Sequence, residues 1–203
     1  MSGAATLRSR GNQVTFERRR TARPVPPRLQ LSPRAVRRAH PRESVDSSTF
    51  LDAMSLAVTG VSIVTTDGVA GRFGITVSAV ASLSADPPLV LASINQRSPA
   101  CAAVRENGVF CINLLSTQQQ ELADTFAGRP THGEPFDFRR PAWSPGTSGS
   151  PHFDDAVATF DCVLEQTHEA GSHTLFIGRV VEAIGSTADP LLYTRRAYGR
   201  PCR

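Results

Sequence analysis

Short apolar segments separated by turn residues fill residues 60–98, and this pattern restricts the fold more than any other feature of the chain. One apolar segment ends at Asp67-Gly68, a second follows a glycine-rich stretch, and a third begins after Asp86-Pro87. Such Asp-Gly and proline-containing pairs are typical of turns between neighbouring strands. A parallel sheet would need helices between its strands, and the chain lacks a regular β-α-β alternation. The sequence therefore predicts an antiparallel sheet.

The rest of the chain adds more strands and a few short helices. Ser47-Ser48-Thr49 offers N-cap candidates for a helix near 50–54 that ends by Gly60, and Ser98-Pro99 begins a helix that runs to residue 107. A further helix is expected at 117–127 and a long loop at 128–151. The expected strands are 61–66, 74–83, 88–94, 109–115, 156–167, 174–184 and 191–198. The predicted fold is mainly β with short helices, arranged as an antiparallel barrel, and the apolar run 88–94 is predicted to be buried on both faces.

Composition is that of one globular domain. The chain has 203 residues, of which 40% are hydrophobic, enough for a sizeable core. No apolar run approaches the ~20 residues that span a bilayer, and the N-terminus lacks the apolar core of a signal peptide. The four cysteines lie far apart without a CxxC pair, so we expect no metal site, reduced thiols and a cytoplasmic location. Cys101, Cys111 and Cys162 occupy apolar positions and are predicted core residues.

Positive charge is concentrated at the N-terminus. Residues 1–48 contain 11 arginines and 3 acidic residues, a net charge of +8, whereas the remainder has 11 arginines and 15 acidic residues, a net charge of −4. This segment is rich in proline and poor in periodic apolar positions, so we predict a disordered extension at 1–48 and a folded domain at 49–203. Three explanations of this segment stay open: an upstream extension through a misassigned start codon, an organelle targeting peptide, or an arm that binds nucleic acid.

Residues 74–79 have the character of a ligand site. They combine small side chains with the hydroxyls of Thr76 and Ser78, so a flat ligand can approach the main chain closely. An ordinary exposed strand face is the alternative. A Rossmann fingerprint is absent, because the glycines within 68–74 have the wrong spacing and precede a strand.

The loop 95–98 is the best candidate for binding a phosphate. It leads into the expected helix at Pro99, and a helix N-terminus presents free N–H groups and a partial positive charge. Ser98 can add its hydroxyl, or it can serve only as the helix cap.

Several separated motifs resemble those of a single family. They are Thr59-Gly60-Val61, Thr65-Thr66, 74–79, 82–84 with 86–90, 110–114, 118–127, Gly171-Ser172-His173, 190–193 and Tyr198-Gly199. Through them, residues 49–200 resemble the flavin reductase-like FMN-binding split barrels. Many members of this family are the reductase components of two-component flavin monooxygenases. The resemblance implies an antiparallel split β-barrel.

The resemblance also implies an NAD(P)H:flavin oxidoreductase. NADH or NADPH would transfer a hydride to FMN or FAD, and the reduced flavin would pass to a partner flavin-dependent monooxygenase. A homodimer is implied as well. The alternatives within the same architecture are a flavin held as a fixed prosthetic group and a non-catalytic flavin-binding module.

The family pattern assigns flavin-binding residues. The isoalloxazine ring would lie along the main chain of residues 75–79, and the ribityl chain and phosphate would lie at the end of the third strand and the start of the following helix. Arg129 would be a further, charge-assisted phosphate donor, or else an exposed loop arginine. The expected cofactor-binding residues are Ile75, Thr76, Val77, Ser78, Ala79, Ser93, Ile94, Asn95, Ser98, Ala100 and Arg129.

His173 is the catalytic candidate. It lies in Gly171-Ser172-His173, which resembles the family's Gly-Asp-His motif beside the nicotinamide. Ser172 stands where the motif has an acidic residue that would fix the tautomer and orientation of the imidazole, so coenzyme affinity and preference stay open. A histidine beside a hairpin turn is otherwise usually a surface residue. Trp143 in the long loop either packs over the flavin or anchors the loop.

Overall fold

The computed structural model describes residues 43–139 and 143–202. The folded unit begins at Ser44. Most of the predicted extension at 1–48 lies outside the described residues.

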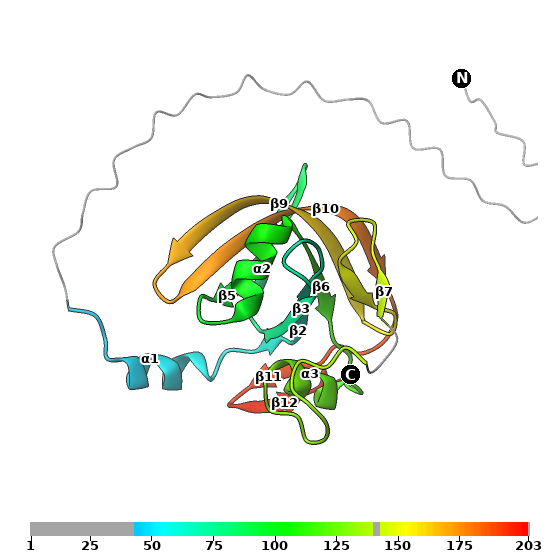
Figure 1. Ribbon diagram of the computed structural model, residues 1–203. Helices are drawn as coiled ribbons and strands as arrows, with labels where there is room; N and C mark the ends of the chain where they lie inside the picture. The colour runs from blue at the N-terminus through cyan, green and yellow to red at the C-terminus, as the bar shows by residue number, and fades with distance from the viewer. Residues whose placement is uncertain (1–42, 140–142, 203) are drawn as a thin grey trace, which may run out of the picture. The chain divides into compact units, whose positions relative to one another are not determined.

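Seven strands form the main sheet, in the order β3-β2-β6-β9-β10-β5-β4 (Figure 1). They are β2 (Ser62–Thr66), β3 (Phe73–Val77), β4 (Val80–Ala85), β5 (Pro88–Asn95), β6 (Val109–Leu114), β9 (Ala158–Ala170) and β10 (His173–Gly185). Every neighbouring pair is antiparallel. The prediction of an antiparallel, mainly β fold is therefore confirmed.

The sheet curls so that its two edges come together where the chain passes from one to the other. β3 and β4 stand at opposite ends of the strand order, yet they are consecutive in the chain and are joined only by Ser78-Ala79. The Ala79 carbonyl accepts a hydrogen bond from the Ser93 N–H at 3.0 Å, which holds this connection against β5. β3 and β4 are the two edge strands and do not pair with each other within the described residues, so the barrel is split between them.

The predicted single strand at 74–83 is therefore wrong. Residues 73–77 and 80–85 form two strands at opposite edges of the sheet. Neither glycine nor proline marks the break at Ser78-Ala79. The sequence therefore reads as one continuous strand across it.

Three helices accompany the sheet: α1 (Ser47–Met54), α2 (Pro99–Asn107) and α3 (Gln120–Phe126). α2 contacts β2, β3, β5 and β6, and Figure 1 shows it within the curve of the sheet. As predicted, Ser98 caps α2, with Pro99 in its first turn. α3 begins three residues later than expected and contacts β2 and β3. No helix among the described residues is long and apolar enough to cross a membrane.

Two buried clusters form the core. The larger one joins the sheet to α2 and consists of Val64, Val77, Val90, Ala92, Ile94, Cys101, Val104, Phe110, Ile112, Cys162 and Phe176. The smaller one surrounds α3 and consists of Val61, Ile63, Leu115, Ala123, Phe126 and Leu191. Cys101, Cys111 and Cys162 are buried, which confirms their predicted place in the core.

The prediction that 88–94 is buried on both faces is wrong. Along β5 the side chains of Val90, Ala92 and Ile94 are buried, while the residues between them are only half-buried. An apolar run does not reveal whether a second layer covers the other face.

The C-terminal strand predicted at 191–198 is a hairpin. β11 (Leu192–Thr194) and β12 (Ala197–Gly199) form a small sheet with β1 (Thr59–Gly60). The turn consists of Arg195 and Arg196, both with positive φ, and neither is a residue type that signals a turn. Gly60 belongs to β1, so it pairs in this sheet rather than ending a helix.

The proline-rich loop at 128–151 also contains paired backbone. β7 (Trp143–Pro145) pairs with β8 (Pro151–Phe153). Trp143 packs against Phe126, Phe138 and Phe153, with ring centroids 5.2–5.6 Å apart. Of the two readings of Trp143, its packing supports the loop anchor.

α1 lies on the surface. Asp46, rather than the predicted Ser47–Thr49, is its N-cap and accepts from the Thr49 N–H at 3.0 Å. Hydrogen bonds from Ser48 and Thr49 hold the pKa of Asp46 well below its usual range. None of the residues of α1 is buried. An ion pair of 2.6 Å between Asp52 and Arg196 ties the helix to the β11–β12 hairpin.

Candidate functional site

A cavity of about 330 Å³ lies at the split of the barrel. It is lined by the end of β3, the connection to β4, the end of β5 and the start of β10. The lining residues are Ile75, Thr76, Val77, Ser78, Ala79, Ser93, Asn95 and His173. All eight belong to the set predicted from the sequence. The fold thus brings together segments that are up to about a hundred residues apart in the chain, although flavin contact by these residues stays a prediction.

Strand pairing places His173 at this cavity. His173 is the first residue of β10 and pairs with Asn95 on β5 and with Ala170 on β9. Gly171, with φ +60°, provides the turn between β9 and β10. The imidazole therefore projects from a position whose backbone is held from both sides.

The hydroxyls of the cavity differ in their availability. Thr76 Oγ1 donates to the Ala123 carbonyl at 2.7 Å, so its hydrogen is used to hold α3 against β3. Ser78 is exposed, and its hydroxyl has no partner within the described part of the chain. Ser78 is thus the freer donor to a ligand.

Gly74, by contrast, does not open the site to a ligand. It is buried, and a side chain at this position would meet Phe126 Cε1 at 2.6 Å and Phe138 Cζ at 2.9 Å. Aromatic rings of the core occupy the space that the sequence suggested for a flat ligand. The approach to the main chain is instead at Ser78 and Ala79, which are both exposed.

Four predicted residues do not line the cavity. The side chain of Ile94 is in the core, and Ala100 is buried in α2. The Ser98 hydroxyl accepts from the Ala100 N–H at 3.3 Å, as a helix cap does. Arg129 is exposed beyond α3, where its N–H donates to the Asp124 carbonyl at 2.9 Å.

Arg97 is a residue that the sequence reasoning missed. It lies between Asn95 and the α2 cap, and its N–H donates to Asn95 Oδ1 at 2.9 Å. Its exposed guanidinium has no ion pair within the part of the chain that the structure describes. Its place in the sequence, directly before the serine that caps the expected helix, could have indicated a cation near a phosphate.

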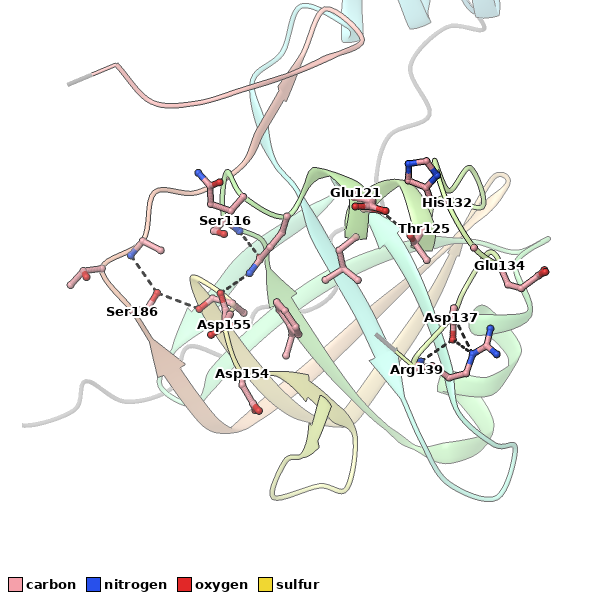
Figure 2. A pocket seen from close by; sticks show the side chains of 18 residues that line it. Ser116, Glu121, Thr125, His132, Glu134, Asp137, Arg139, Asp154, Asp155 and Ser186 are labelled. Carbon is pink, nitrogen blue, oxygen red and sulfur yellow. Dashed lines mark hydrogen bonds and ion pairs between the residues drawn. The ribbon is translucent and has the colours of Figure 1, made fainter. Parts of the chain in front are cut away.

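A second, larger groove of about 1130 Å³ lies beside α3 and β8 (Figure 2). Its lining contains none of the predicted site residues. Among the described residues, five carboxylates line it, against one guanidinium, that of Arg139, which is paired with Asp137 at 2.9 Å. The acidic residues are Glu121, Glu134, Asp137, Asp154 and Asp155. Such a surface repels an anionic phosphate, whereas none of the described residues that line the smaller cavity is a carboxylate.

Residues 54–201 match the model of the flavin reductase like domain. This span is most of the chain and includes every residue of the cavity. The chain belongs to the flavin reductase-like family.

Named relatives of this flavin reductase-like protein agree with the match. It is 40% identical over 157 residues to "FMN reductase (NADH) RutF 1" of Methylorubrum extorquens (strain PA1), covering 76% of each chain. Its structure is similar to that of flavin reductase PheA2 in its native state, with a TM-score of 0.72 and 31% identity over 78% of this chain and all of that one. It is also similar to the styrene monooxygenase flavin reductase of Pseudomonas putida S12, with a TM-score of 0.66 and 29% identity over 76% of this chain and 98% of that one. The predicted split-barrel fold is thereby confirmed.

Proposed function

We propose that this flavin reductase-like protein reduces FMN with NADH and passes the reduced flavin to a partner flavin-dependent monooxygenase. The observation that carries the proposal is the cavity at the split, where exposed main chain, the free hydroxyl of Ser78 and His173 meet, with no carboxylate among the described lining residues. The name of the M. extorquens relative specifies FMN and NADH, and that of the P. putida structure specifies a styrene monooxygenase flavin reductase. A bound flavin supplies the ring that accepts the hydride.

The cavity residues fit a planar ligand with a polar edge. Ser78 and Ala79 have small exposed side chains, so the main chain of 75–79 can bond the polar edge of a flat ring. Asn95 has its Oδ1 engaged by Arg97, which leaves its amide Nδ2 as a donor to the ribityl hydroxyls. The protein's part is to hold two rings at reactive distance and to exclude water between them.

The start of α2 is the proposed phosphate site. The Ser98 oxygen accepts from Ala100, yet its hydroxyl hydrogen is available to a phosphate oxygen. The exposed Arg97 is next to it in the chain and adds a charge-assisted donor. Arg129 is the alternative cation.

Arg97→Ala should raise the KM for FMN severalfold, and Arg129→Ala is the matched substitution. Equal effects of both substitutions on this KM would remove the preference for Arg97.

We also propose that the protein is a homodimer in the cytoplasm. α1 is a helix of 8 residues without a buried residue, and so short a helix is marginal in water unless its apolar face is packed. Phe50, Leu51, Met54, Leu56 and Val58 are each more than half exposed around it. A second copy of the chain would cover them. The four cysteines are free thiols, which favours a reducing compartment.

The decisive experiment is NADH and NADPH oxidation by the purified protein with FMN, FAD or no flavin added. We expect oxidation that requires added flavin, saturates with it, and is fastest with NADH and FMN. Oxidation that needs no added flavin would indicate a prosthetic flavin instead. Flavin binding without oxidation by either nucleotide would leave a binding module and overturn the proposal.

His173→Ala tests the assigned role of the imidazole. We expect the KM for NADH to rise and the rate to fall, because the ring is the side chain of β10 that faces the cavity. His168→Ala is the matched control: it lies on the same hairpin, is exposed, and within the described residues hydrogen-bonds only Gln166, at 3.3 Å. Unchanged NADH oxidation in His173→Ala would remove the catalytic assignment.

A further inference from the structure

Ser172 lies beside the imidazole of His173, and its backbone is hydrogen-bonded to the loop after β5. Its carbonyl accepts from the Gln96 N–H at 3.0 Å, and Gln96 Nε2 donates to the His173 carbonyl at 3.4 Å. The peptide between residues 172 and 173 is thus tied to the loop after β5. With the backbone held in this way, Ser172 Oγ lies 2.9 Å from His173 Nδ1.

No carboxylate among the described residues bonds His173 Nδ1 in place of this hydroxyl. Two acidic residues of the hairpin are paired with arginines: Glu165 with Arg179 at 2.6 Å, and Glu169 with Arg105 at 3.5 Å. Within the described ranges, His173 has no acidic residue at ion-pair distance. The ring nitrogen on this side therefore bonds a neutral group.

A carboxylate permits only one tautomer of a neutral imidazole that it bonds, whereas a hydroxyl is compatible with either one. A carboxylate can only accept, so it selects the form with hydrogen on Nδ1, whereas a serine hydroxyl can also donate. The nitrogen that carries the hydrogen is set by the bond that the other nitrogen makes. When Ser172 donates to Nδ1 of His173, the hydrogen is on Nε2, and Nε2 has no partner within the described part of the chain.

We propose that Ser172 is a positioning residue that holds neutral His173 as the Nε2–H tautomer, so that the ring presents a hydrogen-bond donor to the carboxamide oxygen of the nicotinamide. This inference rests on the proposed function. Ser172 is exposed, so water can satisfy its oxygen lone pairs while its one hydrogen is given to Nδ1. The Nε2–H donor then faces the amide oxygen of the nicotinamide. A neutral ring bound by a carboxylate would instead present the lone pair of Nε2 to that oxygen.

Nitrogen NMR of the histidine rings in the full-length protein tests the tautomer directly. The spectrum is recorded at a pH where the ring is neutral, and His173→Asn assigns its signals. We expect an unprotonated Nδ1 and a protonated Nε2 in the wild type and in Ser172→Thr, which keeps the hydroxyl. Ser172→Asp should exchange the two signals. A protonated Nδ1 in the wild type would overturn the proposal, whether or not the protein oxidises NADH.

Steady-state kinetics test the link to the nicotinamide. Loss of one hydrogen bond of ordinary strength predicts that Ser172→Ala raises the KM for NADH about fivefold, with a smaller change in kcat and with recovery in Ser172→Thr. An unchanged KM would overturn this link even if the tautomer is as expected. Absence of NADH oxidation in the wild type would instead overturn the proposed function, and the NMR result would still decide the tautomer.

Discussion

At the scale of single residues, Gly74 shows how tightly the core limits this part of β3. We predict that Gly74→Ala lowers the free energy of unfolding by about 1–3 kcal/mol, because the added methyl group overpacks a filled core. It would lie under 3.0 Å from the rings of Phe126 and Phe138. Urea denaturation measures the change. Gly185→Ala is the matched control, since nothing lies within 4 Å of a side chain there; equal losses in both variants would contradict the packing argument.

Two of the buried thiols, those of Cys111 and Cys162, should make the free energy of unfolding fall at alkaline pH. Burial is the main cause that raises the pKa of Cys162 to about 12 from its ordinary 9.0, and it raises the pKa of Cys111 further. Above pH 9 the unfolded chain releases these protons while the folded chain retains them, so the free energy of unfolding falls as pH rises, by about 1.4 kcal/mol per pH unit for each thiol. As pH rises from 9 to about 12, the free energy of unfolding of the wild type should fall by about 1.4 kcal/mol per pH unit more than that of Cys162→Ala. Parallel curves for the two proteins across this range would refute the prediction.

At the scale of elements, the start of α2 combines capping with the proposed phosphate site. Ser98→Ala should cost about 1 kcal/mol of stability, because the Ala100 N–H loses its acceptor. Ser98→Asp keeps a good cap and retains stability. If Ser98 faces the phosphate, the new carboxylate should raise the KM for FMN on the order of tenfold. Denaturation and steady-state kinetics separate the two roles, and an unchanged KM in Ser98→Asp would leave Ser98 as a cap alone.

The elements also show how far the sequence allowed prediction. Turns marked by Asp67-Gly68, and the serine-proline start of α2, were predictable because their residue types have strong local preferences. The break at Ser78-Ala79 was not, since it is enforced by pairing with β5 rather than by local preference. All eight residues of the cavity were anticipated through family motifs. The core position of Gly74 required knowledge of which rings pack on β3.

At the scale of the whole molecule, the exposed apolar surface of α1 predicts association. Phe50 and Met54 are 53% and 51% exposed, and burying an apolar side chain of this size stabilises by about 1.5–3 kcal/mol. Phe50→Ser combined with Met54→Ser should therefore raise the dimer dissociation constant by on the order of a hundredfold.

Sedimentation velocity over a range of protein concentrations measures this change. Val69→Ser is the matched control, because Val69 is 86% exposed and lies in the turn between β2 and β3, away from α1 in the chain. We expect the control to sediment as the wild type does, since a single exposed apolar residue is ordinary on a protein surface. A wild type that sediments as a monomer at all concentrations would exclude the dimer. Equal weakening by Val69→Ser would place the interface elsewhere, because α1 would then have no special part in it.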